Sequence, residues 1–192
     1  MTIHINDFKT AFGGGTRQNR FVVTGNFPYG EVQGGGPSSV SKFHIRATQM
    51  PALSTLTMEY NYFGRKGYYP GEKQYPAWSV AVIDDTPELY DMWKKFSYWH
   101  NQINQHSNNI SDSFKNYKAD SWTVQQLNLN GEIDPSLKTF EMFGVWPRAI
   151  MDVNLNMATP NTLNQFTVVL VFDYIKLYSG AYNAGNRLTA EP

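Results

Sequence analysis

The chain of 192 residues contains no cysteine. This absence excludes disulfides, thiolate metal sites and cysteine nucleophiles, so stability has to come from packing or from assembly. There is also no excess of charge of one sign, because sixteen basic residues balance sixteen acidic ones. Tight binding of nucleic acid needs a basic surface that displaces counterions, so only weak or transient contact with a nucleic acid is expected.

Long hydrophobic runs are missing as well. No stretch approaches the ~20 apolar residues of a membrane helix, and the N-terminus lacks the order of a signal peptide. We therefore expect a soluble protein without a membrane anchor, made in the cytoplasm. Charged residues form only 17% of the chain and aromatic residues 15%. This composition fits a surface that is hidden in an interface, and it fits an aromatic-rich β core equally well.

Residues that could carry chemistry are sparse. Asp84 and Asp85 could act as an acid or metal pair, but neighbours in a strand point to opposite faces, and Asp85 suits a helix cap. His100 and His106 match no common spacing of metal ligands. We expect His100 in the core and His44 on the surface. No Gly-x-Ser-x-Gly motif is present. The sequence therefore predicts no enzymatic activity, no metal site and no cofactor.

A single domain over residues 1–192 is expected, with two irregular ends. Glycine runs at Gly13–Gly15 and Gly34–Gly36 interrupt regular structure, which indicates glycine-rich loops over about residues 1–40. The segment from about 178 to 192 has no periodicity and is expected to be a flexible tail.

Alternation of apolar and polar residues predicts a mainly β protein. Strands are expected near residues 20–27, 43–48, 55–62, 68–69, 78–83, 122–129, 137–143, 151–157 and 166–175. The strands at 78–83 and 166–175 are expected to be buried on both faces. Turns are expected at Gly64–Gly67 and at Asn130-Gly131, since both of the latter residues tolerate positive φ.

One helix interrupts the strands. Asp85 or Thr86 can cap it, and Pro87 suits its first turn. Its expected inward stripe consists of Leu89, Trp93, Phe96, His100 and Ile103, and charged residues lie off that stripe. The fold class that follows is an antiparallel β-sandwich or barrel with one inserted α-helix.

Several motifs in the middle and C-terminal parts occur in an order that resembles the tail tube family of contractile-tailed bacteriophages. They cover about Phe43 to Leu177. In chain order they are Tyr62-x-Gly64-Arg65-Lys66, Gly71-Glu72, Trp78-Ser79-Val80, Asp84-Asp85, Val124-Gln125-Gln126-Leu127, Asn130-Gly131-Glu132-Ile133, Gly144-Val145-Trp146-Pro147, Phe166-Thr167-Val168 and Phe172-Asp173-Tyr174. The chain departs from the family pattern in its long glycine-rich start, its C-terminal tail, and an Asp-Asp in place of Asn-Asp before the helix.

The resemblance implies a structural virion protein whose hexameric rings stack into the inner tail tube, which conducts DNA into the host cell. In such rings the inner sheets of neighbouring subunits close a β-barrel around a lumen. The implied partners are further copies of the chain, the tail sheath protein, baseplate and tail terminator proteins, a tape measure protein in the lumen, and transiently the genomic DNA. The implied location is the virion tail, assembled in the host cytoplasm.

Three sets of residues are expected to contact these partners. Small polar and acidic side chains that let DNA slide are expected to face the lumen: Thr55, Thr57, Glu59, Asn61, Asp152, Asn154 and Asn156. Contact between rings is expected from Tyr62, Arg65, Lys66, Tyr68 and Tyr69. The helix is expected to face the sheath through Glu88, Asp91, Lys94 and Lys95.

Other functions remain open from the sequence. A baseplate tube initiator, or the tube of a phage-derived injection or secretion system, would have the same fold. A carbohydrate-binding β-sandwich that uses exposed Trp and Tyr side chains is a further alternative.

Overall fold

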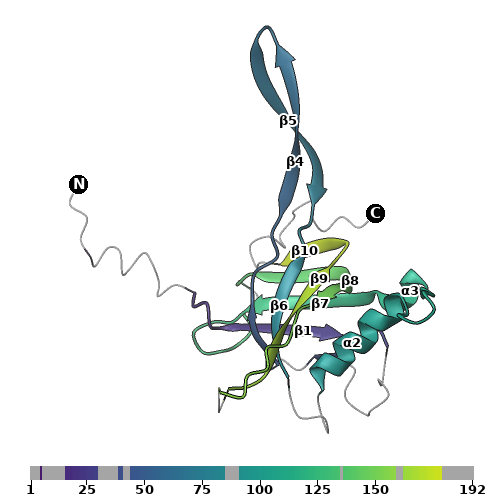
Figure 1. The fold of residues 1–192 in the computed structure, drawn as a ribbon. Helices are drawn as coiled ribbons and strands as arrows, with labels where there is room; N and C mark the ends of the chain where they lie inside the picture. Colours follow the sequence, from purple (N-terminus) through teal and green to yellow (C-terminus); the bar gives the residue numbers. More distant parts are fainter. Residues whose placement is uncertain are drawn as a thin grey trace.

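The computed structural model describes residues 5, 16–29, 39–40, 44–84, 91–134, 136–158 and 162–178. Antiparallel strands are the main regular structure of this part, which confirms the predicted fold class (Figure 1). The strands are β1 (Phe21–Asn26), β2 (Ser39–Val40), β3 (Ile45–Thr48), β4 (Ser54–Tyr62), β5 (Arg65–Gln74), β6 (Trp78–Ile83), β7 (Ala119–Gln126), β8 (Thr139–Ile150), β9 (Gln165–Val171) and β10 (Tyr174–Tyr178). The helices are α2 (Met92–Ile103) and α3 (Phe114–Tyr117).

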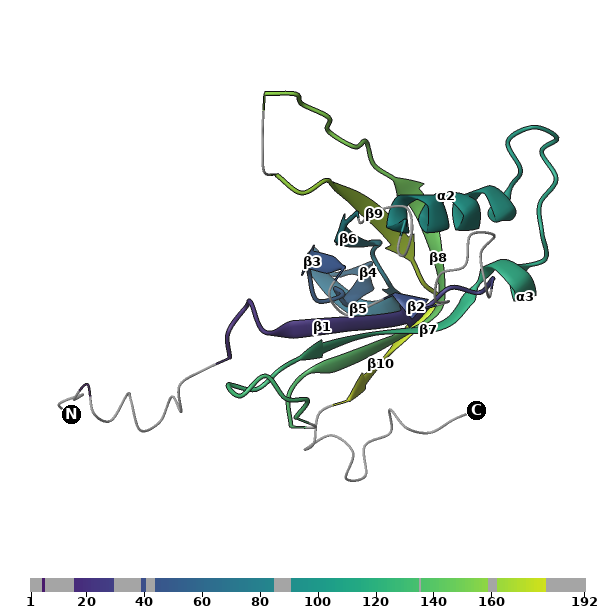
Figure 2. The same cartoon turned by 90° about the horizontal axis from the view of Figure 1, so that it is seen from below.

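The long strand β8 belongs to two sheets. Its first half pairs with β7 on one side and with β10 on the other, while its second half pairs with β9. One sheet therefore has the order β2-β1-β7-β8-β10, and the second runs from β8 through β9 and β6 to β3. Figure 2 shows β1, β7 and β10 on one side of the body, with β3, β6 and β9 opposite them. This is a sandwich whose two layers share one bent strand.

The bend in β8 lies at Gly144. This residue has φ of 64°, and a Cβ placed on it would lie 2.2 Å from the Asp173 carboxylate. Lys118 Nζ donates to both Asp173 oxygens, at 2.8 and 2.7 Å. Asp173 also donates its backbone N–H to Phe143 O at 2.9 Å. The bend thus combines a positive φ, which favours glycine, with an acidic side chain fixed in the space beside it.

The core between the sheets is aromatic and is closed by α2. The rings of Trp99 and Trp122 stack with centroids 6.1 Å apart, and Phe27 meets Phe96 edge-on at 5.1 Å. Trp99 Nε1 donates to Tyr117 O at 2.6 Å, so its polar atom is satisfied although the ring is buried. Large buried rings of this kind supply much of the apolar area that stabilises the fold.

The inward stripe of α2 differs from the predicted one. The buried residues are Met92, Lys95, Phe96 and Trp99, whereas Trp93 is 43% exposed. The stripe is rotated by about one residue, because Trp99 and not Trp93 stacks on the core tryptophan. His100 is only half-buried, and His44 is buried instead of lying on the surface. Both histidine predictions are therefore wrong.

The start of α2 also differs. Asp91 is its N-cap and accepts from Lys94 N at 2.8 Å, and Asp84 accepts from Trp93 N at 3.3 Å. The expected caps, Asp85 and Thr86, lie outside the described residues. The capping role of Asp84 gives its carboxylate a structural task in place of acid or metal chemistry.

Three strand predictions need correction. Residues 151–156 lie in no strand, although Met151 N still donates to Thr167 O at 2.8 Å. Strand β6 buries only one face, since Ser79 is exposed and alternate residues are half-buried. The predicted 166–175 strand is divided into β9 and β10 by a break at Phe172-Asp173, and its register on β8 shifts between Pro147 and Ala149. The sequence predicts burial on both of its faces, but alternate residues of β9 are only half-buried.

The predicted hairpin is confirmed as β4 and β5, with its turn at Phe63-Gly64 and not at Gly64–Gly67. It projects well beyond the body (Figure 1). Among the described strands, β4 and β5 pair only with each other. The Asn130-Gly131 turn joins β7 to β8 as predicted, with positive φ at Gly131.

We expect Gly144→Ala to lower the free energy of unfolding by about 2–4 kcal/mol, because it combines left-handed strain with displacement of Asp173. Gly131→Ala is the matched control, since Gly131 also has positive φ but no atom within 4 Å of the added Cβ. The control should lose only about 1 kcal/mol. Urea unfolding of the unassembled protein measures both, and equal losses would show that the Asp173 contact does not define the bend.

Candidate assembly surfaces

One face of the β4–β5 hairpin is apolar and exposed. Tyr60 and Tyr69 stack on it with centroids 4.6 Å apart, and Tyr62 meets Phe63 edge-on at the tip. Phe63 is 89% exposed. Leu56 and Met58 are further exposed apolar side chains on this face. An exposed apolar strip on a two-stranded sheet is typical of a surface that another molecule covers.

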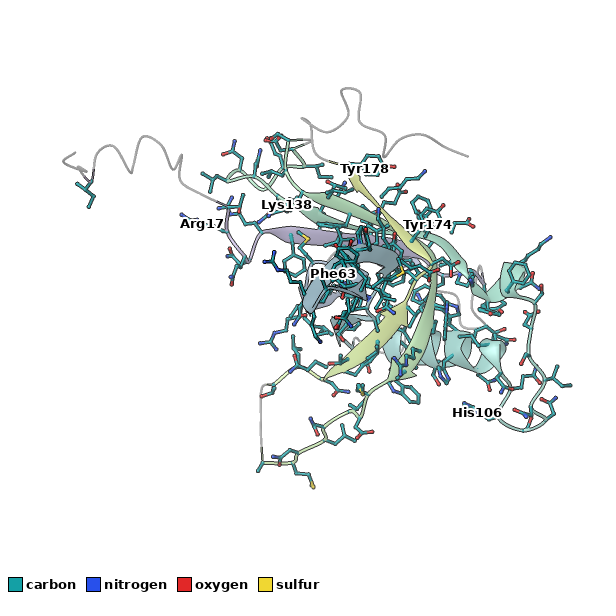
Figure 3. The ribbon with its side chains drawn as sticks, turned by 90° about the horizontal axis from the view of Figure 1, so that it is seen from above. Arg17, Phe63, His106, Lys138, Tyr174 and Tyr178 are labelled. Atoms are coloured by element: carbon teal, nitrogen blue, oxygen red, sulfur yellow. The ribbon has the colours of Figure 1, made fainter. Side chains whose placement is uncertain are left out.

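The opposite face of the hairpin is polar. It carries Thr55, Thr57, Glu59 and Asn61 on β4, and the paired β5 residues Lys73, Pro70, Tyr68 and Lys66. Glu59 and Lys66 form an ion pair at 2.6 Å. The predicted contact residues are therefore divided between the faces, with Tyr62, Arg65 and Tyr69 on the apolar face. Figure 3 views the hairpin end-on with Phe63 at its tip.

The second predicted lumen segment lies in the loop after β8. Asp152, Asn154 and Asn156 are exposed there, and so is Leu155. This loop lies toward the end of the body away from the hairpin (Figure 1). The structure therefore places the two predicted lumen sets on different elements at different ends of the molecule.

A groove lies between α2 and the end of β8, with a volume of about 610 Å³. It is lined by Trp93, Ser97, His100, His106, Arg148, Ala149, Ile150, Met151, Asp152 and Val153. The rings of His100 and His106 stack with centroids 6.0 Å apart. Sequence reasoning missed this groove, because the residues that line it come from two segments that are distant in the chain. A signal was present in α2: it carries two tryptophans, and only Trp99 is needed for the core, which leaves Trp93 on the surface.

This groove makes two of the predictions incompatible. Asp152 shares it with three residues of α2, so Asp152 cannot face the lumen if α2 faces the outside of a tube. The predicted sheath-facing residues also need correction, because Lys95 is only 5% exposed. Burial lowers the pKa of Lys95, which nearby Asp91 partly opposes. Lys94 is exposed, and Glu88 lies outside the described residues.

A third surface is the outer face of the β1-β7-β8-β10 sheet. Strand pairing places Thr24, Thr123, Glu141 and Lys176 in one row across it. The neighbouring rows contain Ser121, Phe143 and Tyr174, and Val22, Gln125, Thr139 and Tyr178. Tyr178 donates to Glu141 Oε2 at 2.9 Å, and burial together with this carboxylate raises the pKa of Tyr178. The inward faces of these strands pack on the core with α2, so this face points away from α2 (Figure 2).

Within the described ranges, no group of three His, Asp or Glu side chains could hold a metal ion. No helix in the described part of the chain is both long and apolar enough to cross a membrane.

The loop between α2 and α3 is fastened to the segment after β1. Tyr29 OH donates to Asp112 at 2.9 Å, and Asn116 Nδ2 and Ser113 N donate to the same carboxylate. The three donors lower the pKa of Asp112, with the Asn116 bond contributing most. Burial and the Asp112 carboxylate raise the pKa of Tyr29 above its usual range.

A carboxyl whose folded pKa is lowered stabilises the fold above its unfolded pKa, and this contribution disappears as pH falls through the folded pKa. We therefore expect the attachment of this loop to weaken below about pH 4. Hydrogen exchange of the Ser113 amide measures it. Asp112→Asn should remove the acid-dependent step, and persistence of that step in the variant would contradict the assignment.

Sequence comparison with known proteins identifies a family for most of the chain. Residues 16–178 match the family described as phage tail tube protein. Tail tube protein gp19 of Enterobacteria phage T4 is 26% identical over 132 residues, which cover 69% of this chain and 78% of that protein. The tail tube protein of Serratia phage KSP90 is 25% identical over 170 residues, covering 85% and 90% of the two chains.

Solved structures share the fold. A chain of the sheath-tube complex of the PVC extracellular contractile injection system, in its extended state, superposes with a TM-score of 0.57 at 15% identity, over 93% of this chain and 99% of that one. A chain of the tube-terminating cap of the anti-feeding prophage gives a TM-score of 0.59 at 16% identity, over 86% and 91%. With a family match over most of its length, the chain belongs to the phage tail tube protein family.

Proposed function

We propose that the protein is the tube subunit of a contractile phage tail, and that its hexameric rings stack into a conduit for DNA. The observation that carries the proposal, beyond family membership, is the projecting β4–β5 hairpin. Both of its faces are exposed, and a two-stranded sheet of this kind is only marginally stable by itself. Such an element gains its stability when another copy covers it.

The lumen wall is best supplied by the outer face of the β1-β7-β8-β10 sheet. The two charged residues in its central rows balance, because Lys176 is paired with Glu141. The β1 and β7 part of the face carries the neutral polar residues Thr24, Ser121, Thr123 and Gln125. DNA is held by cations that release counterions, so a neutral wall lets it slide. The polar face of the hairpin fits less well, because Lys66 and Lys73 share it with Glu59.

With that sheet toward the lumen, α2 lies on the outside of the ring. Lys94 is then available to the tail sheath. Baseplate and terminator proteins would meet the ends of the tube, and a tape measure protein would occupy the lumen during assembly in the host cytoplasm. The function is structural and needs no catalytic group.

The double variant Arg65→Ala/Tyr68→Ala should fold normally but form few or no tubes, because both side chains project from the hairpin and not from the core. Negative-stain electron microscopy of the purified protein measures tube formation, and circular dichroism checks folding. Phe114→Ala/Lys115→Ala on α3 is the matched control, with one exposed aromatic and one exposed cation removed. Normal tubes from the hairpin variant would exclude the hairpin as the ring contact.

A map of the assembled tube should place Thr123 and Gln125 at the lumen surface, since both lie on the outer face of the proposed inner sheet. Glu59 or Asp152 at the lumen instead would support the assignment made from the sequence. The same map would show the radial position of α2, and α2 at the lumen would refute both the lumen and the sheath assignments.

A tube of a phage-derived injection system is the second candidate, because chains from two such systems share the fold. A baseplate tube initiator is closely related to both. Indefinite stacking of the purified protein supports a main tube, while single rings that do not stack support an initiator.

A further inference from the structure

We propose that the tip of the β4–β5 hairpin of one copy docks into the groove between α2 and β8 of a second copy. This inference rests on the proposed function, because it names the two surfaces that join successive rings.

The hairpin tip is strained in a way that the protomer does not explain. Phe63 has φ of 46° and is followed by Gly64 with φ of 76°, so both central residues of the turn are left-handed. Such turns favour Asn-Gly, and a bulky side chain in this region costs free energy. The Phe63 ring is nevertheless almost fully exposed. Strain that has no use within one molecule indicates a contact with another.

The groove between α2 and the end of β8 can receive the Phe63 ring. Its volume of about 610 Å³ falls within the range of about 300–1,000 Å³ that is usual for concave binding sites. Its lining includes Trp93, which is exposed, and the apolar residues Ile150 and Val153. An aromatic side chain that enters it can pack edge-to-face on Trp93 and bury about 150–250 Å².

The charges agree at one point of the contact. Arg65 follows the tip, and Asp152 lies in the groove; within the described part of the chain neither forms an ion pair. A guanidinium that enters beside Phe63 can pair with the Asp152 carboxylate. Arg148 lies in the same groove, so the match is local to Asp152 and does not extend to the whole groove.

The two surfaces face opposite directions. Figure 1 shows the hairpin at one end of the body, with α2 and the loop after β8 toward the other. A knob at one end and a hollow at the other form a heterologous contact, which repeats without closing when copies stack head to tail. Docking of this kind therefore extends along the hairpin direction, as a tube requires.

The absence of native cysteine permits a direct test. Lys66→Cys on the hairpin and Ser97→Cys in the groove are made as separate single-cysteine proteins, mixed, assembled and treated with a short bismaleimide. We expect cross-linked dimers that contain one copy of each variant. With a soluble maleimide, Ser97→Cys alone should react at least about tenfold more slowly in tubes than in the unassembled protein. Lys115→Cys mixed with Lys66→Cys is the control pair and should not cross-link.

Charge reversal gives a second, independent measurement. Arg65→Asp and Asp152→Arg should each raise the protein concentration needed for tube growth by about tenfold or more, and the double variant should restore much of the loss. The docking would be overturned if tubes grow normally, the Lys66→Cys and Ser97→Cys proteins do not cross-link, and Ser97→Cys reacts with maleimide as fast in tubes as in the unassembled protein. That result would leave the proposed tube function intact. Protection of Ser97→Cys only after addition of the sheath protein would also overturn it, in favour of a sheath segment. Failure of the unmodified protein to form tubes or rings would count against the proposed function itself.

Discussion

The sandwich depends on one strand that belongs to both of its layers. Because β8 turns at Gly144, its first half completes the sheet with β7 and β10, while its second half carries β9 and the strands beyond. The Lys118–Asp173 ion pair fixes the outside of this turn. The core, the position of α2 beside the end of β8, and the groove between them all follow from the direction in which β8 leaves the bend.

A second constraint is the uneven distribution of apolar surface. The core rings are packed within the protomer, whereas the hairpin and the loop after β8 expose large apolar side chains, Met157 fully. Both explanations that the composition allows are therefore compatible with the structure. Aromatic residues build the core between the sheets, and they also form the strip that a neighbouring copy is proposed to cover.

Sequence periodicity predicted the helices and strands better than it predicted which of their faces are buried and which segments they contact. The β4–β5 hairpin, the pairing of β7 with β8 and the central strand near residue 170 could be predicted because local alternation and turn residues specify them. The inward face of α2 could not, since Trp93 and Trp99 both fit an apolar stripe and only packing on Trp122 decides between them. Residues 151–157 alternate as a strand does, yet none of the described strands pairs with them beyond the hydrogen bond from Met151 N to Thr167 O. The groove joins a helix to a strand end distant in sequence, and no local pattern encodes that proximity.

The different ends of the protomer have a consequence for the finished structure. If copies stack by the proposed docking, the stack is polar: one of its ends presents hairpins, and the other presents grooves. Proteins that start and stop tube growth would then need different binding surfaces, one that receives the hairpin and one that fills the groove. Each can recognise its own terminus by shape alone, without measuring how many rings lie between them.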